Sequence, residues 1–436
     1  MDKLLEVREF DKITGNANFV NDKQYKYLDA AAFHDLVEFI HEFSGDEENA
    51  DALDFMRVSY KRNVGDVVII KNYVGLIQMN NGYQVQVLPK ISFDSGEDAG
   101  NKETKRIFLK MLKSMKDFPC KVFNDASIKV DRMNLYEIFI NMYLQEVRQL
   151  VKRGIKNAYV GHEDNLLFCK GKLLTSQHIK TNMSHKERFY VAYDEVNPNR
   201  PENKLVKATL IKLQKQTASA ENSKEIRQFL TAFEIVKPST NYTKDFSQVI
   251  IERNTKDYEM LMQWSKVFLV NCSFTTFSGR NTSRALLFPM ESVYESFIAQ
   301  QLKKILAASD WEVSIQDKGF HLFIQPRRQF ALRPDIVCRR GDRIVIMDTK
   351  WKSLINSERA NYGISQSDMY QMYAYSKKYE TPEIWLLYPL NDEMRGHADI
   401  EFSSGDGTIV RLHFVDLTRI PATLEDLRNK LEVKES

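Results

Sequence analysis

Cysteine is scarce in this sequence. Its 436 residues contain four, at positions 120, 169, 272 and 338, and no two of them form C-x-x-C or another closely spaced pair. Such isolated cysteines exclude a disulfide-framed secreted domain and a cysteine-based zinc site. We therefore expect reduced thiols and a cytoplasmic protein.

Several familiar motifs are missing as well. The eight histidines form no H-E-x-x-H, and neither G-x-x-x-x-G-K-[ST] nor G-x-G-x-x-G occurs. A metalloprotease or a self-contained nucleoside triphosphatase is therefore not expected. Residues 1–12 alternate charged and apolar side chains, which argues against a signal peptide. No stretch reaches the roughly 18 uncharged residues of a membrane span, so we expect no membrane contact.

The net charge is small, but it is unevenly distributed. The 62 Lys and Arg against 59 Asp and Glu give +3, whereas residues 1–60 hold 14 acidic and 6 basic side chains, so their −8 leaves +11 on the rest. Residues 147–190 have nine basic and three acidic side chains, typical of a solvated surface or of a phosphate-contacting face. Residues 325–352 have eight basic and three acidic side chains, which favours a polyanionic substrate.

The remaining composition is typical of a globular protein with several domains. Hydrophobic residues make up 43% and charged residues 28%, and 436 residues suggest about three domains. We expect an α+β multidomain chain with a partner-docking domain at 1–92, a mainly helical domain with short strands within 160–193 at 103–284, and an α/β domain at 285–436. The turn-rich stretch 93–102 is predicted to be an exposed linker.

The N-terminal domain contains a strong hairpin signal. A helical pattern at 28–43 is followed by two alternating apolar runs within 64–91, which flank Asn80-Asn81-Gly82. Asn-Gly between such runs favours a tight hairpin turn. We expect this hairpin to project as a β-finger, and its net negative surroundings suit a basic protein surface better than DNA. A self-contained stabilising β-domain is the alternative.

The C-terminal domain carries the pattern with the most chemical information. The expected elements are a helix at 289–307, strands at 311–315, 320–324, 330–338 and 343–350, a helix at 366–378 and a strand at 384–388. Arg340-Gly341-Asp342 has turn character and lies between the strands at 330–338 and 343–350. These two strands are therefore expected to pair as a hairpin.

Two aspartates and a lysine are expected to meet in that hairpin. Side chains alternate along a strand, so Asp348 and Lys350 point to the same side, and pairing can bring Asp335 beside them. Neighbouring carboxylates repel unless a hard cation lies between them, and Mg²⁺ prefers carboxylate, water and phosphate oxygens. We predict a Mg²⁺ site, with Mn²⁺ as the alternative metal, held by Asp335, Asp348 and the backbone carbonyl of Thr349.

Such a site suits phosphodiester hydrolysis. The metal lowers the pKa of a water and neutralises a phosphate oxygen, while Lys350 orients the nucleophile or stabilises the charge of the transition state. The alternative is that Asp335 only ends a strand and that Asp348 pairs with Lys350 or Lys352 as a surface ion pair. A bare D-x-K occurs often by chance.

Pro334-Asp335 and Asp348-Thr349-Lys350, placed between two helices, resemble the motif of the PD-(D/E)xK nuclease superfamily. The resemblance implies a restriction-endonuclease-like core, which is a mixed sheet flanked by helices. The enzyme implied is a metal-dependent DNA endonuclease acting on double-stranded DNA.

The same resemblance suggests further site residues. Glu295 on the first helix resembles the extra acidic residue of many members, with Glu291 as its competitor, and Gln371 resembles the glutamine of a Q-x-x-x-Y pattern on the second helix. Glu295 and Gln371 would assist catalysis. The residues expected to contact DNA are Arg333, Lys352 and Tyr375.

A closer resemblance covers most of the chain. The runs Tyr73–Gly75, Val87–Ile91, Asp194–Lys207, the nuclease motif, Asp368–Tyr375 and Leu386–Pro389 stand in the order of the McrC family, the nuclease subunits of McrBC-type restriction systems. Members of that family dock onto an oligomeric ring of an AAA+ GTPase of the McrB type and stimulate its GTP hydrolysis, so GTP is used by the partner. In such systems the partner commonly recognises the DNA, including 5-methylcytosine.

The resemblance gives the N-terminal hairpin a partner. Tyr73, Asn81, Tyr83 and Lys90 are the residues expected to bind the GTPase ring. Two other functions stay open, namely a stand-alone repair or structure-specific DNA nuclease and a degenerate nuclease fold used for DNA binding or assembly. An intact set of two aspartates and a lysine argues against the degenerate fold.

Overall fold

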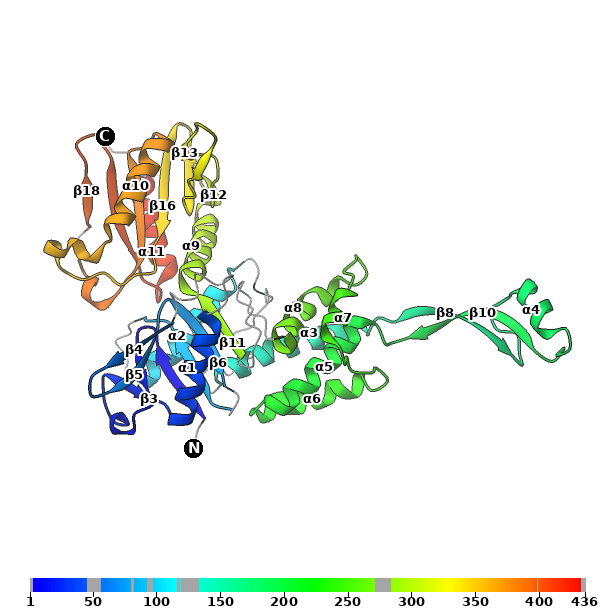
Figure 1. Ribbon diagram of the computed structural model, residues 1–436. Coiled ribbons are helices and arrows are strands. Elements are labelled where there is room, and N and C mark those ends of the chain that lie inside the picture. Colours follow the sequence, from blue (N-terminus) through cyan, green and yellow to red (C-terminus); the bar gives the residue numbers. More distant parts are fainter. Residues whose placement is uncertain are drawn as a thin grey trace. The chain divides into compact units, whose positions relative to one another are not determined.

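Two compact units make up the structure. The computed structural model describes residues 3–44, 56–79, 82–91, 97–115, 118, 133–270, 284–397 and 399–432. One unit comprises residues 1–121 and 273–436, and the other comprises residues 122–272 (Figure 1). Helices and several mixed sheets occur, as expected for an α+β multidomain chain. In the described part of the chain, no helix is both long and apolar enough to cross a membrane.

The first unit begins with a small sheet and one helix. The sheet has the strand order β3-β2-β5-β4. The bounds are β2 Lys12–Thr14, β3 Tyr25–Tyr27, α1 Ala30–Ser44, β4 Met56–Lys61 and β5 Gly65–Ile70. Helix α1 confirms the pattern at 28–43, and its Phe33, Leu36 and Ile40 are buried in the core that this sheet helps to form.

The predicted hairpin is present, but it does not project. Strands β6 (Tyr73–Gln78) and β7 (Gln84–Leu88) pair antiparallel, which confirms the hairpin. Strand β1 (Leu4–Arg8) pairs with the other side of β7, and β11 (Arg284–Pro289) pairs with the other side of β6. The prediction of a free β-finger is wrong because both edges of the hairpin are already hydrogen-bonded in a four-stranded sheet.

One glycine allows β11 to approach β6 so closely. Gly75 pairs with Leu287 of β11 and has a φ of +143°. A Cβ atom at this position would lie 1.9 Å from the carbonyl oxygen of Leu286. Since no side chain fits in that space, glycine is required for the pairing.

Strand β11 also changes the expected domain boundary. The sequence assigned residues 285–436 to a separate C-terminal domain, yet the first of these residues complete the N-terminal sheet. The ranges 1–92 and 285–436 consequently lie in one compact unit. The linker predicted at 93–102 is wrong from Glu97 onward, where α2 (Glu97–Leu112) begins; this helix buries Phe108 against Phe288, with the ring centroids 6.0 Å apart.

The second unit is a helical bundle with a long arm. The bundle consists of α3 Leu135–Arg153, α5 Pro201–Gln216, α6 Ala220–Ala232, α7 Tyr242–Ser247 and α8 Glu259–Val270. The arm consists of β8 Ala158–Leu166, β9 Lys172–Leu173, α4 Thr175–Asn182 and β10 Phe189–Asn197 (Figure 1). Short strands were predicted within 160–193, whereas β8 and β10 pair along all nine residues of each.

A six-stranded mixed sheet forms the rest of the first unit. Its order is β12-β15-β16-β17-β19-β18. The bounds are α9 Met290–Leu306, β12 Glu312–Ile315, β15 Ile336–Arg340, β16 Arg343–Thr349, α10 Gln366–Tyr379, β17 Glu383–Pro389, β18 Glu401–Ser403, β19 Ile409–Val415 and α11 Ile420–Glu432. Strands β15 and β16 pair antiparallel, which confirms the predicted hairpin.

Helices cover this sheet, and one predicted strand is interrupted. Helices α9 and α11 pack together on the sheet, and α10 packs on β16 and β17. The strand predicted at 330–338 is two strands, β14 (Gln329–Ala331) and β15, and β14 pairs with β13 (His321–Phe323) in a separate ribbon. Pro334 lies between β14 and β15, and proline has no N–H with which to continue a ladder.

Candidate active site

Asp335 is fixed to the end of the neighbouring strand. It directly precedes β15, and its Oδ2 accepts hydrogen bonds from the backbone N–H and from the hydroxyl of Thr349, both at 2.7 Å. Ile336 pairs with Met347, so Asp335 lies at the level of Asp348. Asp335 Oδ1 has no hydrogen-bond partner among the residues described. This oxygen is therefore available to a ligand.

Asp348 and Lys350 face each other on the same side of the chain, as strand alternation predicts. Asp348 is only 2% exposed, and its Oδ2 lies 2.7 Å from Lys350 Nζ. The contact is an ion pair without the alignment of a hydrogen bond, since this oxygen has no hydrogen-bond partner in the described part of the chain. Lys350 Nζ also donates to Gln371 Oε1 at 3.2 Å. Helix α10 thus reaches the site through Gln371.

Gln371 connects the lysine to a buried tyrosine. Its Nε2 donates to the hydroxyl of Tyr375 at 2.8 Å, while its Oε1 accepts from Lys350. Tyr375 is 1% exposed and belongs to the core between α10 and the sheet. A side chain buried to this degree offers almost no surface to DNA. Tyr375 instead holds the side chain of Gln371 in place through this hydrogen bond. The Q-x-x-x-Y spacing places both residues on one face of the helix.

Asp368 is a site residue that sequence reasoning missed. It lies in the first turn of α10, where its Oδ2 accepts from Lys352 Nζ at 2.8 Å and its Oδ1 lies 3.7 Å from Lys350 Nζ. Lys352, expected to contact DNA, is therefore held by a carboxylate, whereas Arg333 is exposed. The sequence signal that could have identified Asp368 is its spacing from Gln371, because residues three apart lie on the same face of a helix.

Glu295 rather than Glu291 lies near the aspartates. Glu295 on α9 is half-buried and accepts a hydrogen bond from Gln316 Nε2 at 2.9 Å, and the charges that act on it are those of Asp335 and Lys350. Glu291 is exposed, and its charge acts on Glu9. The structure therefore brings Glu295 together with the predicted motif.

Burial and mutual repulsion disfavour the charged form of the carboxyl groups in this site. Burial, with a further contribution from the charge of Asp335, raises the pKa of Asp348 to about 7 and that of Glu295 to about 7. Burial also raises the pKa of Asp335, against the hydrogen bonds from Thr349. Burial alone lowers the pKa of Lys350, but the charges of Asp348 and Asp368 outweigh it and raise that pKa above its usual value.

The donor set fits a hard divalent cation. Asp335 and Asp348 supply only oxygen atoms, which Mg²⁺ and Mn²⁺ prefer. The raised pKa values of Asp335, Asp348 and Glu295 mean that one ammonium group does not balance the buried carboxylates. A cation would remove this imbalance, and the open Oδ1 of Asp335 provides a ligand atom.

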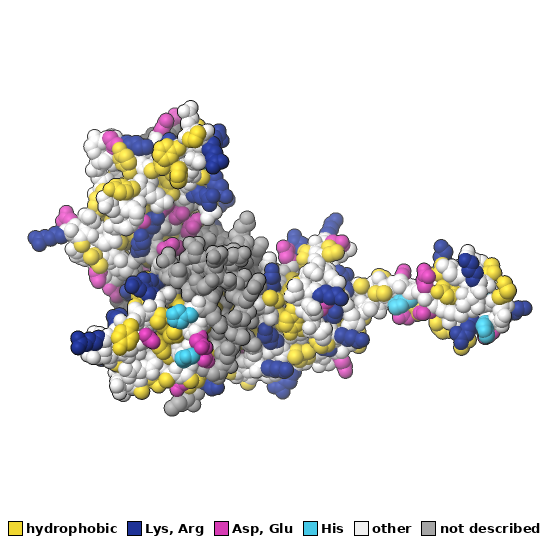
Figure 2. Space-filling model, in the orientation of Figure 1, with side chains coloured by type: hydrophobic (Ala, Val, Ile, Leu, Met, Phe, Trp, Pro, Cys, Tyr) yellow, Lys and Arg dark blue, Asp and Glu magenta, His cyan; other side chains and the backbone are white. Residues whose placement is uncertain are grey.

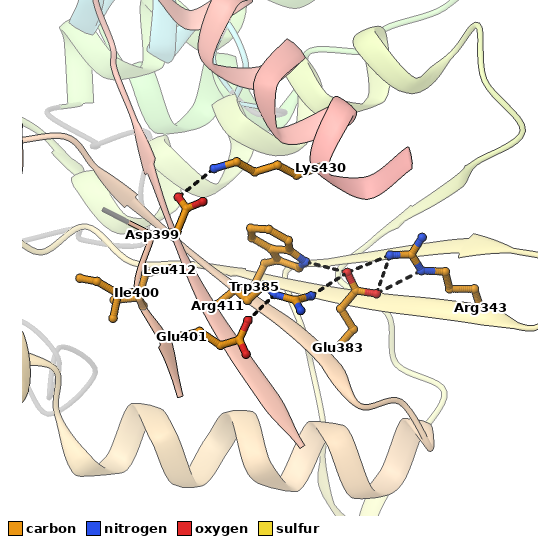
Figure 3. A pocket seen from close by; sticks show the side chains of 9 residues that line it. All are labelled: Arg343, Glu383, Trp385, Asp399, Ile400, Glu401, Arg411, Leu412 and Lys430. Atoms are coloured by element: carbon orange, nitrogen blue, oxygen red, sulfur yellow. Dashed lines mark hydrogen bonds and ion pairs between the residues drawn. The ribbon is translucent and has the colours of Figure 1, made fainter. Parts of the chain in front are cut away.

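A separate cavity lies against strands β17 and β19. Its volume is about 260 Å³, and Figure 3 shows its lining residues. Glu383 binds Arg343 and Arg411, while Asp399 binds Lys430. Since its acidic and basic groups neutralise each other, this cavity has the character of a structural ion-pair network.

The residues expected to bind a partner do not form one exposed patch. Tyr73 and Tyr83 are partly buried against the N-terminal core. Lys90 is exposed, and its backbone N–H donates to Glu9 at 3.0 Å. Asn81 lies outside the described residues.

Comparison with known proteins gives this arrangement a family. Residues 68–389, which include both the N-terminal hairpin and the Asp335, Asp348 and Lys350 cluster, match the family described as "McrBC 5-methylcytosine restriction system component". The chain belongs to this family. It is also 22% identical over 280 residues to the "Type IV methyl-directed restriction enzyme EcoKMcrBC" of Escherichia coli K12, a match that covers 60% of this chain and 75% of that protein.

Solved structures from Thermococcus gammatolerans resemble this McrBC-family chain in fold. A chain of the half-complex of McrB AAA+ hexamers with bound McrC has a TM-score of 0.73 and 20% identity, covering 98% of this chain and 100% of that chain. A chain of the McrBC complex has a TM-score of 0.52 and 21% identity, covering 70% of this chain and 89% of that chain. The similarity to the first structure therefore extends over nearly the whole length.

Proposed function

We propose that this chain is the DNA-cutting, McrC-type subunit of a McrBC-like restriction complex and that residues 290–432 form a PD-(D/E)xK nuclease domain. The observation that carries the proposal is the cluster of Asp335, Asp348 and Lys350 at the ends of two paired strands. Membership of a restriction-system family makes double-stranded DNA the expected substrate.

Asp335 and Asp348, with the backbone carbonyl of Thr349, would hold Mg²⁺ or Mn²⁺. When bound, the metal supplies Lewis acidity and neutralises charge on the phosphate. Asp335 is oriented for this role because Thr349 fixes its Oδ2 and leaves Oδ1 open. Asp348 is held by the apolar interior around β16.

Lys350 would act as a cation rather than as a base. Hydrolysis joins a water oxygen to phosphorus and breaks the bond to one sugar oxygen, so negative charge accumulates on the phosphate. Because neighbouring carboxylates raise the pKa of Lys350, this side chain stays protonated and can stabilise that charge. Gln371 positions the ammonium group, because its Oε1 accepts a hydrogen bond from Lys350 Nζ.

Glu295 is suited to assist with proton transfer. It lies at the edge of the site, and its pKa of about 7 is close to the pH at which such an enzyme works. Its Oε1 accepts the hydrogen bond from Gln316, whereas its Oε2 has no hydrogen bond in the described part of the chain and can exchange a proton.

The second unit supplies the more suitable surface for the motor partner. The arm carries large apolar side chains on its surface, namely Tyr159, Val160, Leu167, Phe168, Ile179, Met183 and Val196. In Figure 2, hydrophobic and basic side chains lie side by side at the arm's tip. An exposed apolar surface of this kind is typical of an interaction site. We propose that the arm, rather than the hairpin at 64–91, contacts the AAA+ ring, a partner that the related structures contain.

The function is tested by mixing the chain with duplex DNA, Mg²⁺ and GTP, with and without a GTPase of the McrB type. Cleavage that requires both the partner and GTP supports the proposal. Cleavage by the chain alone would instead identify a stand-alone nuclease, and absence of cleavage under all conditions would identify a degenerate nuclease fold. Stimulation of GTP hydrolysis, measured in parallel, reports on assembly.

A further inference from the structure

A two-stranded ribbon leads directly into the candidate active site. Strands β13 and β14 pair with His321 opposite Ala331 and Phe323 opposite Gln329. Leu332 N–H bonds the carbonyl oxygen of Phe320, which closes the base of the ribbon, and Asp335 follows three residues later. The ribbon is therefore connected to Asp335, a proposed metal ligand, by only a short stretch of backbone.

The base of the ribbon is anchored. The ring of Phe320 lies 4.3 Å from that of Tyr379 on α10, and the Tyr379 hydroxyl donates to Asp317. Asp317 also accepts from Arg339 of β15 at 2.9 Å. These contacts fix where the ribbon leaves the domain.

The tip of the ribbon is apolar and exposed. Phe323 is 55% exposed and Phe330 is 68% exposed, and their rings form an edge-to-face pair with centroids 5.9 Å apart; Ile324 is exposed beside them. Leaving three large apolar side chains in water is unfavourable, and such an exposed cluster marks a contact surface.

One residue of this exposed pair also has a strained backbone. Phe330 has a φ of +55°, a conformation that bulky side chains rarely adopt. Strain of this type persists where the surrounding structure or a function maintains it. Here the strained residue is the one whose ring is most exposed in the pair.

The charge of the ribbon identifies the kind of partner. Residues 321–334 contain Arg327, Arg328 and Arg333 and no acidic residue. Arg327 and Arg328 are exposed and have no ion-pair partner among the residues described. Figure 2 shows hydrophobic and basic side chains together at the end of the domain where Figure 1 labels β13. Unpaired arginines beside an apolar wedge suit a polyanion with stacked bases.

We propose that the β13–β14 ribbon distorts duplex DNA beside the cleaved bond, with Arg327 and Arg328 on phosphates and the Phe323–Phe330 pair inserted in the minor groove at a base step. Apolar wedges of this kind kink DNA in other proteins, and each phosphate contact adds to the salt dependence of binding. The inference rests on the proposed nuclease function, because it places the ribbon on the substrate.

Binding is measured on the full-length chain with Asp348→Ala, so that DNA stays intact, by fluorescence anisotropy with a labelled duplex from about 50 to 200 mM NaCl. Arg327→Ala with Arg328→Ala should lower the slope of log K against log salt by about 2. Lys23→Ala with Arg62→Ala removes two exposed charges far from the ribbon in sequence and should keep the original slope. An unchanged slope in the ribbon variant would overturn the phosphate contacts.

Base unstacking is measured with duplexes that carry 2-aminopurine at successive positions. The parent chain should raise the fluorescence at one or more positions, and Phe323→Ala with Phe330→Ala should abolish the rise while keeping the salt slope. Phe330→Gly removes the ring and the backbone strain together, so it should keep or raise Tm and still reduce the rise. A fluorescence rise that persists in both variants, or ribbon variants that impair only GTPase stimulation, would overturn the proposal.

The two hypotheses fail in different ways. If the unmodified chain with its partner, GTP and Mg²⁺ cuts DNA and the ribbon variants cut and bind like it, only the ribbon inference fails. If the unmodified chain never cuts DNA, the proposed function fails whatever the binding experiments show.

Discussion

Trp351 donates its indole N–H to the carboxylate of Glu9, a residue 342 positions away in the sequence. The two distances from Nε1 to the carboxylate oxygens are 3.2 and 3.1 Å, and Glu9 also accepts from the backbone N–H of Lys90. Trp351 directly follows Lys350, and its ring packs on Tyr294, next to Glu295. The N-terminal segment is thus hydrogen-bonded to the segment that carries Asp348 and Lys350.

Loss of this hydrogen bond should destabilise the first unit. Trp351→Phe leaves a buried acceptor with one donor fewer, and we expect a loss of about 1–3 kcal/mol in the free energy of unfolding. Trp311→Phe is the matched control, because Trp311 is 5% exposed against 6% for Trp351 and its Nε1 has no partner among the described residues. Denaturant unfolding of both variants measures the difference. Equal losses would show that the Glu9 contact contributes nothing.

Glu9 should make stability depend on pH in an unusual direction. Burial raises its pKa from 4.5 to about 7, so the folded chain holds a proton between these pH values that the unfolded chain has lost. The free energy of unfolding should therefore fall by about 3 kcal/mol as pH rises from about 4.5 to 7, and level off above. Glu9→Gln keeps one oxygen for both donors and should remove this part of the slope. A slope that is the same in both proteins would contradict the assignment.

Metal binding should release protons at neutral pH. Asp348, with a pKa of about 7, is largely protonated below that value and must ionise to bind a cation. The affinity for Mn²⁺ should therefore rise about tenfold per pH unit up to pH 7 and then level off. Calorimetric titration at several pH values measures this, with Asp348→Asn as the control. An affinity that is independent of pH from 5.5 to 8 would rule out Asp348 as a ligand.

Gly75 should tolerate no side chain. Gly75→Ala places a Cβ 1.9 Å from the Leu286 carbonyl oxygen, so β6 and β11 must separate, at a cost of about 3 kcal/mol or more. Gly65→Ala is the control, since Gly65 also has a positive φ but has no atom within 4 Å of the added Cβ, and it should cost about 1 kcal/mol. Thermal unfolding distinguishes the two. Similar Tm values for both variants would contradict the close approach.

Local patterns were sufficient to predict the core of the candidate site. Alternation along 343–350 and the turn at Arg340–Asp342 predicted the hairpin, and the structure places Asp335, Asp348 and Lys350 together as that hairpin requires. Helical spacing likewise predicted α9 and α10. These features depend on neighbours in the sequence, and periodicity reports them directly.

Contacts between distant segments could not be predicted in this way. Glu9 looks like one more charge in an acidic segment, and only the approach of Trp351 buries it. The hairpin at 64–91 was expected to project because nothing local shows that β1 and β11 cover its two edges. Asp368 was overlooked because a carboxylate in the first turn of a helix is usually explained by its favourable interaction with the helix dipole.

The central claim is that Asp335, Asp348 and Lys350 form the nuclease site. The most direct measurement compares DNA cleavage by Lys350→Ala and by Lys352→Ala, each assembled with the GTPase partner, Mg²⁺ and GTP. Lys350→Ala should lower cleavage by about a thousandfold or more, whereas Lys352→Ala should lower it by less than about tenfold, with GTPase stimulation unchanged in both. Cleavage at the unmodified rate by Lys350→Ala would contradict the account.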